Sequence, residues 1–219
     1  MRPRQPFDFE AIATVFVEQG YEGASMEDVA DRAGVAKRTL YHHFGSKAEL
    51  FDATIGYVCD RVVAYLFAEY DRAEALPSPD GRRVALEAFF EYAAANPVHR
   101  ELLFGLKATP PAAAARIEAT RRLITDRISL TFRRRGALRG RPDGRVNDVM
   151  AAMTVGATDH VLRLMSESSG WDRDAVLSLM NELWSHAFGN VRLETLIRVN
   201  ETSPPDPVAV QSGRRPTQR

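Results

Sequence analysis

Apolar residues recur every three or four positions along most of this chain, which is the spacing of one face of an α-helix. The first such stretch begins at Phe9 and is ended by Gly20 and Gly23, since glycine disfavours a helix interior. Its apolar positions are Phe9, Ile12, Ala13 and Phe16. No useful length of sequence alternates apolar and polar residues as a half-buried strand does. The pattern predicts an all-α protein whose first helix begins at Phe9.

Two short helical patterns follow the first helix. Ser25 stands three residues before Asp28, an arrangement typical of a capping box, and Gly34 ends the helix that it begins. The apolar face of this helix consists of Met26, Val29, Ala30 and Ala33. Only two residues separate Gly34 from a second short pattern at 37–44, which Gly45 ends. We therefore predict two short helices joined by a tight turn.

The rest of the chain is predicted to form longer helices. Ser46 and Glu49 form a second capping box, after which an apolar stripe continues for about seven turns. Breaks fall at 76–81, at Asn96 with Pro97, at 109–111 and at a loop over 136–144. Apolar stripes over 146–164 and 176–191 then predict two long amphipathic helices. We divide the chain into an N-terminal domain (1–47), a larger helical domain (48–200) and a Pro-rich, polar, disordered tail (201–219).

The two short helices with a supporting helix on each side have the layout of a helix-turn-helix, whose second short helix enters the major groove of DNA. Leu40 and Phe44 form the apolar side of this second helix. Its other face presents Lys37, Arg38, Tyr41 and His42, flanked by Thr39 and His43. Lys47 stands at the start of the next helix, where backbone N–H groups favour a phosphate. These side chains suit phosphates and guanine edges.

Charge qualifies this interpretation. The whole chain has 29 basic and 29 acidic residues, and its first 50 residues hold more carboxylates than cations. The cations are Arg2, Arg4, Arg32, Lys37, Arg38 and Lys47, and the carboxylates are Asp8, Glu10, Glu18, Glu22, Glu27, Asp28, Asp31 and Glu49. DNA binding must therefore depend on where the cations lie, and a solvated helical hairpin is the alternative.

The run SMEDVADRAGVAKRTLYHHFGSKAELF, at 25–51, resembles the DNA-binding domain of the TetR family of bacterial transcriptional regulators. The residues that carry the resemblance are Ser25, Ala33, Gly34, Val35, Leu40, Tyr41, His43, Phe44, Lys47 and Leu50. It implies base-facing roles for Lys37, Arg38 and Tyr41, and phosphate contacts for Ser25, Thr39, His42, His43 and Lys47. The chain departs from the family pattern at Ala36, where a Ser or Thr cap is frequent, and at Arg38, where a small residue is frequent.

The resemblance also implies a homodimeric repressor that a small-molecule effector releases from a double-stranded DNA operator. The last two long helices would form the dimer interface, although their stripes also suit helices buried within one monomer. No effector contact is assigned. Candidate pocket walls are Tyr57, Phe89, Phe90, Phe104 and Trp171, which core packing explains equally well. Six arginines lie between 133 and 145, and Asp143 is the only carboxylate among them. Such a run is most often a solvated helix end, and the alternative is a site for an anionic effector.

Other classes of function have little support in the sequence. No nucleophile elbow, phosphate loop or paired-cysteine motif is present, so neither catalytic residues, a metal nor a cofactor is expected. His42 and His43 point about 100° apart on a helix and cannot share one metal. His99 and His186 lack nearby ligands in sequence, and His160 is interpreted as a core or interface residue. An enzyme, or a helical binding protein that has lost DNA binding, are the alternatives.

The expected location is the cytoplasm. The single cysteine, Cys59, forms no intrachain disulfide, fits a reducing compartment and is interpreted as a small buried hydrophobe. The N-terminus MRPRQPFDFE lacks the apolar stretch of a signal peptide. No apolar run approaches the roughly 18 residues of a membrane span, so no membrane partner is expected.

Overall fold

The computed structural model describes residues 7–105, 109–138, 140, 143–167 and 170–201, and every element among them is helical. This confirms the predicted all-α class. The elements are α1 (Phe9–Gly23), α2 (Met26–Ala33), α3 (Lys37–Phe44), α4 (Lys47–Glu74), α5 (Ser78–Ala95), α6 (Pro97–Arg100), the π-helix η1 (Glu101–Gly105), α7 (Pro111–Ala137), α8 (Arg145–Glu167), α9 (Arg173–Gly189) and α10 (Leu193–Glu201).

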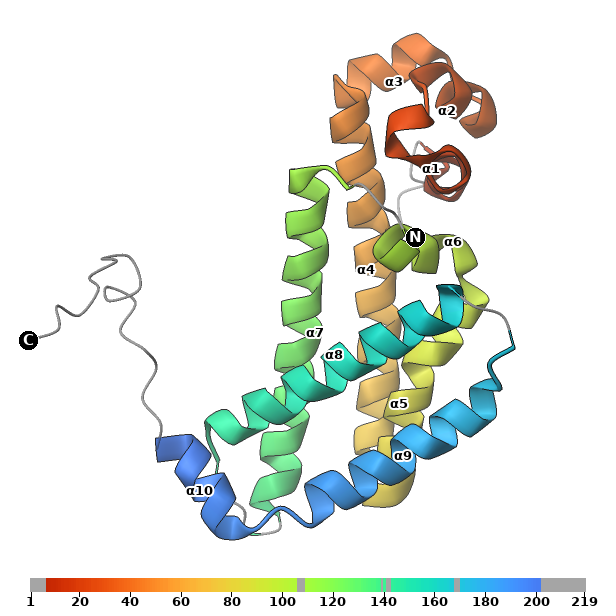
Figure 1. The fold of residues 1–219 in the computed structure, drawn as a ribbon. Helices are drawn as coiled ribbons and strands as arrows, with labels where there is room; N and C mark the ends of the chain where they lie inside the picture. The colour runs from red at the N-terminus through yellow and green to blue at the C-terminus, as the bar shows by residue number, and fades with distance from the viewer. Residues whose placement is uncertain (1–6, 106–108, 139, 141–142, 168–169, 202–219) are drawn as a thin grey trace, which may run out of the picture.

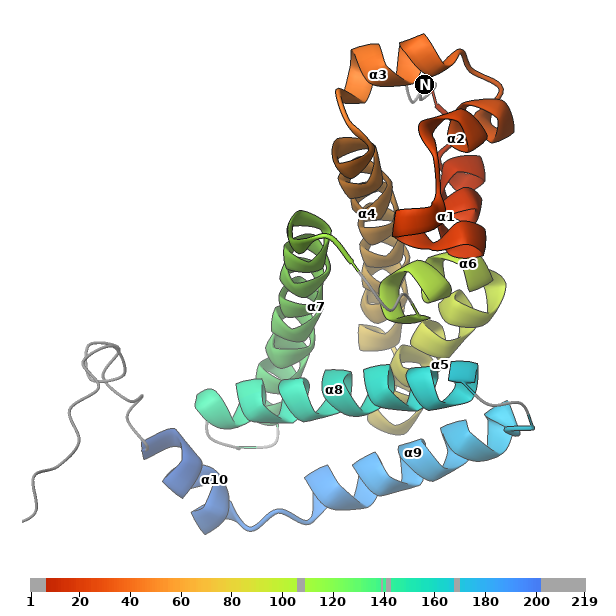
Figure 2. The same ribbon diagram turned by 45° about the horizontal axis from the view of Figure 1, so that its top comes forward.

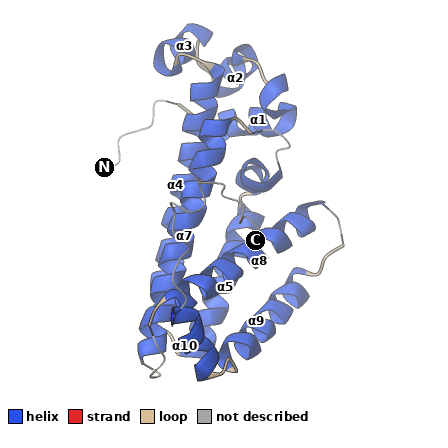
Figure 3. Cartoon of the chain, turned by 60° about the vertical axis from the view of Figure 1, so that its left-hand side comes forward, coloured by secondary structure: helices blue, strands red, loops and turns tan. Residues whose placement is uncertain are grey.

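The helices form a small head and a larger body. In Figures 1 and 2, α1, α2 and α3 lie together at one end, and α4 runs from this head along the length of the molecule. The body is built on α4, which packs against both α5 and α7, while α8 packs on α7. Figure 3 shows the same arrangement from the side, with α8, α9 and α10 at the end away from α3. The head is thus carried on α4 and also contacts α6 and η1.

Local capping explains the boundaries of the head helices. The Ser25 hydroxyl accepts from the Asp28 amide while Asp28 accepts from the Ser25 amide, so the predicted capping box is confirmed. Gly34 then adopts a left-handed conformation (φ 66°) that a residue with a side chain rarely takes. Ala36 provides no side-chain cap for α3, in agreement with the missing Ser or Thr at this position.

Two boundaries differ from the prediction. The first helix agrees with it, since Gly20 interrupts this helix with a positive φ of 71° and Gly23 is its last residue. α7 continues through residues 136–137, predicted as loop, because Arg134 and Arg135 fasten its end to α4 through Glu74 and the Ala73 carbonyl. The last predicted helix, drawn to residue 191, ends instead at 189, and α10 follows as a separate element.

α10 ends at Glu201, the residue at which the disordered tail was predicted to begin, so this first residue of the tail is helical. The remainder of that predicted tail, 202–219, lies outside the described residues.

The core of the head continues into the body. It contains the buried Ile12, Phe16 and Leu40 together with Leu50, Phe51, Ile55 and Val58 of α4. Cys59, which is buried as predicted, and Leu102 of η1 also belong to this core. The boundary at residue 47 remains a prediction, and the first turns of α4 are shared between head and body.

Candidate functional site

The exposed face of α3 lies at the free end of the head (Figure 1). Leu40 is completely buried and anchors the helix, whereas Phe44 is half-buried and packs against Phe7, with ring centroids 5.0 Å apart. The predicted contact residues of α3 are all exposed: Lys37, Arg38, Thr39, Tyr41, His42 and His43. The helix therefore turns its polar side to solvent, as a groove-reading helix must.

Two cations on α3 are held differently. The Lys37 ammonium lies 3.1 Å from Glu27 of α2, and this exposed pair raises the pKa of Lys37 through its hydrogen bond and charge. Arg38 is exposed and, within the described residues, has no ion-pair partner. Tyr41 leaves 46% of its surface exposed. The Arg38 side chain is thus exposed without an ion pair among the described residues, whereas Lys37 is paired with Glu27.

The adjacent histidines do not form a joint site. The ring centroids of His42 and His43 are 6.4 Å apart, and His43 packs edge-on against Phe7 at 4.8 Å. Across the described residues, no group of three or more His, Cys, Asp or Glu side chains is placed to hold a metal. The structure therefore separates these two imidazoles, in line with their predicted divergence on a helix.

Two proposed phosphate contacts already have partners within the head. The Ser25 hydroxyl lies 2.6 Å from Asp28. The half-buried Lys47 donates to the Glu22 and Ala24 carbonyls, both at 3.1 Å, and its ammonium lies 4.7 Å from the ring centre of Tyr21. An ammonium has three donors, so Lys47 holds the α1–α2 connection in place with two of them, and its contact with a phosphate remains a prediction.

Replacing Lys47 with alanine is expected to weaken binding to all duplexes alike, because a phosphate contact carries no sequence information. The slope of log affinity against log salt should fall in magnitude by about one. Gel-shift titrations at several salt concentrations measure this slope. Lys47→Arg keeps the charge and should keep the slope, and an unchanged slope in Lys47→Ala would restrict Lys47 to its bonds inside the head.

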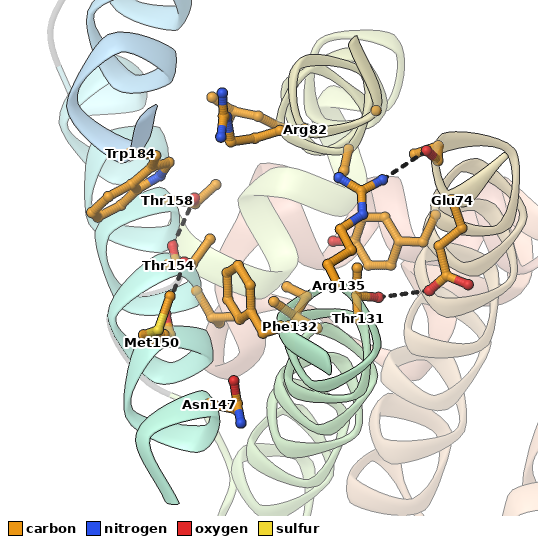
Figure 4. A pocket seen from close by; sticks show the side chains of 18 of the residues that line it. Glu74, Arg82, Thr131, Phe132, Arg135, Asn147, Met150, Thr154, Thr158 and Trp184 are labelled. Carbon is orange, nitrogen blue, oxygen red and sulfur yellow. Dashed lines mark hydrogen bonds between the residues drawn. The ribbon is translucent and has the colours of Figure 1, made fainter. Parts of the chain in front are cut away.

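A second candidate site is a cavity of about 230 Å³ inside the body. Its wall combines side chains of α4, α5, α7, α8, α9 and α10 (Figure 4). The apolar lining residues are Tyr70, Ala73, Ala85, Leu86, Phe89, Ile124, Ile128, Phe132, Val146, Met150, Val155, Trp184 and Leu196. Such a wall favours a ligand with a large apolar part.

Most polar groups of the cavity wall are satisfied by the protein. The hydroxyls of Thr154 and Thr158 donate to carbonyls of their own helix at 2.9 and 2.8 Å (Figure 4). Glu74 accepts from Thr131 at 2.8 Å, and Arg127 and Arg134 lie at 2.7 and 3.0 Å from its oxygens. Burial opposes the ionisation of Glu74, but these bonds and charges outweigh it and lower the pKa of its carboxyl. The carboxylate is therefore charged and structural.

The arginines at the end of α7 divide between two roles. Arg133 pairs with Asp148 of α8 at 2.8 Å and Arg134 with Glu74 of α4, so carboxylates of other helices oppose this run in addition to Asp143. Arg135 instead lies on the cavity wall, as does Arg82 of α5, and its guanidinium donates to the Ala73 carbonyl at 2.9 Å. Arg139 and Arg141 lie outside the described residues. The cavity therefore has two cations among its described lining residues.

Of the predicted pocket walls, Phe89 lines this cavity, and Phe104 lines a smaller one of about 30 Å³ that shares Phe89. Tyr57 packs against the head core, Phe90 is buried in a separate cluster, and Trp171 is exposed. Sequence reasoning missed Tyr70 and Trp184, whereas Arg135 belongs to the arginine run that was weighed as a site for an anionic effector. Their helices share no sequence motif, and only packing brings them together.

A third feature is an apolar face on α8 and α9 that this single chain leaves uncovered. Its large exposed side chains are Val149, Met153 and Leu164 on α8 and Leu179 and Leu183 on α9. His160 is exposed and continues the same helical spacing as Met153 and Leu164, so a position in the core of one chain is wrong, and an interface position remains a prediction. Exposed apolar faces of this kind mark association surfaces.

The head defines the class of protein. The short helix α2, the turn at the left-handed Gly34 and the short helix α3 form a helix-turn-helix of the DNA-binding type, in which the polar face of α3 is exposed. Residues 9–54 match the family described as bacterial regulatory proteins, tetR family. The head, from α1 to the first turns of α4, therefore matches the DNA-binding domain of this family.

Two curated relatives match the chain in part. The transcriptional activator FasR of Mycolicibacterium smegmatis is 35% identical over 122 residues, which cover 54% of this chain and 53% of FasR. The transcriptional repressor KstR2 of Mycobacterium tuberculosis is 39% identical over 61 residues, or 28% of each chain. The chain thus spans about half the length of FasR and less of KstR2. Both relatives are transcriptional regulators rather than enzymes.

The fold of most of the chain is also shared with a solved structure. The transcriptional regulator FadR of Bacillus subtilis, solved in complex with stearoyl-CoA, superposes with a TM-score of 0.66 at 16% identity, covering 80% of this chain and 95% of FadR. At this identity the likeness concerns the fold alone. A search of the described helices for a stretch long and apolar enough to cross a membrane finds none.

Proposed function

We propose that this protein is a homodimeric, sequence-specific DNA-binding regulator, acting as a repressor that a small molecule releases from its operator. The observation that carries the proposal is the exposed face of α3, where Arg38 and Tyr41 lie opposite the buried Leu40 at the end of the head. Arginine pairs with two acceptors of guanine in the major groove. FasR and KstR2, an activator and a repressor, support regulation of transcription.

The proposed DNA contacts fall into two sets, one to base edges and one to phosphates. We assign Lys37, Arg38 and Tyr41, which are exposed on α3, to base edges, as the resemblance to the TetR DNA-binding domain implies. Ser25, Thr39, His42, His43 and Lys47 are assigned to phosphates, which fix the register on the duplex. Lys37 exchanges Glu27 for DNA on binding, and Glu27 then opposes the phosphates, which lowers affinity for duplexes of any sequence.

The apolar face of α8 and α9 supports the dimer. Two copies joined through this face would each present one head, and a two-fold pair of heads reads half-sites about 34 Å apart or a multiple of that distance. Leu179 and Leu183 leave 57% and 56% of their surfaces exposed in the single chain, which a partner would cover.

Charges placed on this face are expected to separate the subunits. The double change Leu179→Glu with Leu183→Glu would bury unpaired carboxylates at the interface, so the dissociation constant should rise at least about 100-fold. Sedimentation equilibrium measures it. Leu123→Glu on α7, where 48% of the side chain is exposed, is the matched control. A dimer that survives the double change would move the interface away from this face.

The effector that we propose for the cavity is a molecule with a long aliphatic part and a polar or anionic end. Phe89, Ile128 and Val155 provide apolar wall, and Arg82 and Arg135 provide positive charge. Stearoyl-CoA, with which FadR of Bacillus subtilis was solved, has both features and supports an acyl thioester as the first candidate. The role proposed for the cavity is regulatory binding, without catalysis.

A bulky side chain in the cavity tests this assignment. Ala85→Trp is expected to abolish stabilisation by stearoyl-CoA in a thermal-shift titration, because the indole ring would fill space that the ligand needs. Ala94→Trp, on the exposed side of α5, is the control and should respond as the natural protein does. Equal ligand responses in all three proteins would place the ligand elsewhere.

The function as a whole is tested by titrating the protein onto the DNA that flanks its gene, with and without stearoyl-CoA. We expect protection of a two-fold symmetric site, and weaker protection with ligand present. A protein that binds stearoyl-CoA but protects no such fragment would be a helical ligand-binding protein that has lost DNA binding. A reporter gene placed behind the protected site gives the sign of regulation.

A further inference from the structure

A buried histidine joins the head to the body. His99 of α6 is 1% exposed, and each of its ring nitrogens contacts a different helix. Nε2 lies 2.9 Å from a carboxylate oxygen of Glu10 on α1, and Nδ1 lies 2.9 Å from the hydroxyl of Tyr92 on α5. Tyr57 of α4 donates to the other oxygen of Glu10 at 2.9 Å, and Arg61 lies 3.6 Å from that oxygen. One head carboxylate is therefore held directly by α4 and α6 of the body, and His99 links it further to α5.

The chemistry of the groups fixes the direction of the bond to Glu10. A carboxylate only accepts, so Nε2 of His99 carries a proton and donates it to Glu10. Burial raises the pKa of Tyr92 to about 12, so this hydroxyl keeps its proton, and it lies 2.9 Å from Nδ1 of His99. His99 therefore bonds to α1 and to α5 at the same time.

The network lies between α3 and the cavities. On the head side, the ring of Tyr57 stacks on Phe9 at 5.3 Å, and Phe9 contacts Phe44 of α3 at 6.1 Å. On the body side, Tyr92 packs in one cluster with Tyr70, Ile124 and Val155, all of which line the large cavity. Continuous packing thus leads from the cavity wall to α3.

The element that carries His99 is itself short and irregular. Asn96 and Pro97 interrupt the helix between α5 and α6, and α6 passes directly into the π-helix η1. Leu102 of η1 belongs to the head core, while Leu103 lines the smaller cavity. Single-turn π-helices often mark functional positions in proteins. Movement of α5 or η1 at the cavity therefore changes the position of His99 directly.

We propose that the Glu10–His99–Tyr92 network is the joint through which occupation of the cavity changes the position of the helix-turn-helix, a proposal that rests on the function proposed above. In one arrangement the three groups are bonded and hold α1 against α5 and α6. A ligand that displaces α5 separates Tyr92 from His99 and frees Glu10. His99, Glu10 and Tyr92 are positioning residues that touch neither DNA nor ligand.

The test measures coupling rather than binding alone. DNA affinity is measured with and without stearoyl-CoA for the natural chain, Tyr92→Phe and Glu10→Gln, which change bonding and little volume. The affinities of each variant for DNA and for stearoyl-CoA should stay within about three-fold of those of the natural chain. The factor by which stearoyl-CoA changes DNA affinity should fall by about five-fold or more. Tyr65→Phe, which removes a hydroxyl bonded to Glu91 on the same body, is the matched control and should keep the full effect.

Hydrogen exchange at the α1 amides of residues 12–16 gives a second measurement that needs neither DNA nor ligand. Tyr92→Phe and Glu10→Gln should raise these rates by about five-fold, and Tyr65→Phe should leave them unchanged. Unchanged coupling in both variants would overturn the joint. If the natural chain binds neither DNA nor ligand, the proposed function is wrong, and the exchange rates of the α1 amides then test the network by themselves. Unchanged rates in the two variants would overturn the joint, and faster rates would support it.

Discussion

Arg38→Ala is expected to weaken binding to the operator by about 1–3 kcal/mol, or roughly 5- to 150-fold, and to relax the preference for one base pair. Arg38 is exposed on α3 and, within the described chain, is not engaged in an ion pair, so its guanidinium needs no internal bond broken before it contacts a base. Lys37→Ala should have a smaller effect, since Lys37 must give up Glu27.

The measurement is a gel-shift titration with the protected fragment and with fragments changed at single base pairs. Arg122→Ala, on the exposed side of α7, removes the same charge far from α3 and serves as the control. It should change affinity by less than two-fold at moderate salt. If both α3 variants keep the sequence preference of the natural protein, other residues read the bases.

Leu40→Ala is expected to destabilise the head by about 2–5 kcal/mol, the range for truncating a fully buried leucine. Leu40 is the only completely buried side chain of α3 and fixes this helix on the head core with Leu50 and Phe51. The cavity left behind would loosen α3, so DNA binding should be lost together with the stability of the head.

Hydrogen exchange at the amides of α2 and α3 measures this effect within the whole protein, as does the midpoint of urea unfolding. Leu123→Ala, at a half-exposed position on α7, should lower stability by less than about 1 kcal/mol. Leu40→Met conserves volume and should cost under about 1.5 kcal/mol. Native exchange rates at α3 in Leu40→Ala would contradict the anchoring role.

The helix-turn-helix was predictable because local chemistry specifies it. Ser25 with Asp28 caps α2, Gly34 supplies the left-handed turn, and Gly45 ends α3, all within a few residues of the helices that they delimit. The exposed side of α3 also follows from its sequence, since burial of Leu40 determines which neighbours face solvent. The DNA contacts themselves remain predictions.

The end of α7 shows where local patterns were insufficient. Residues 136–137 contain a glycine and were predicted as loop, yet the helix continues through them. Arg134 and Arg135 bond to α4, some 60 residues earlier in the chain, and these bonds outweigh the cost of a glycine in a helix. The sequence pattern contains no sign of that partner.

By itself the sequence determined the helical class, the caps and turns of the head, and the side of α3 that faces outward, because each depends on residues within one or two turns of one another. Only the tertiary structure decided that Lys47 bonds to the Glu22 and Ala24 carbonyls, that Arg135 lines a cavity, and that His99 links Glu10 to Tyr92. Those relations join side chains of separate helices, and their geometry is set by packing between elements, which no local periodicity encodes.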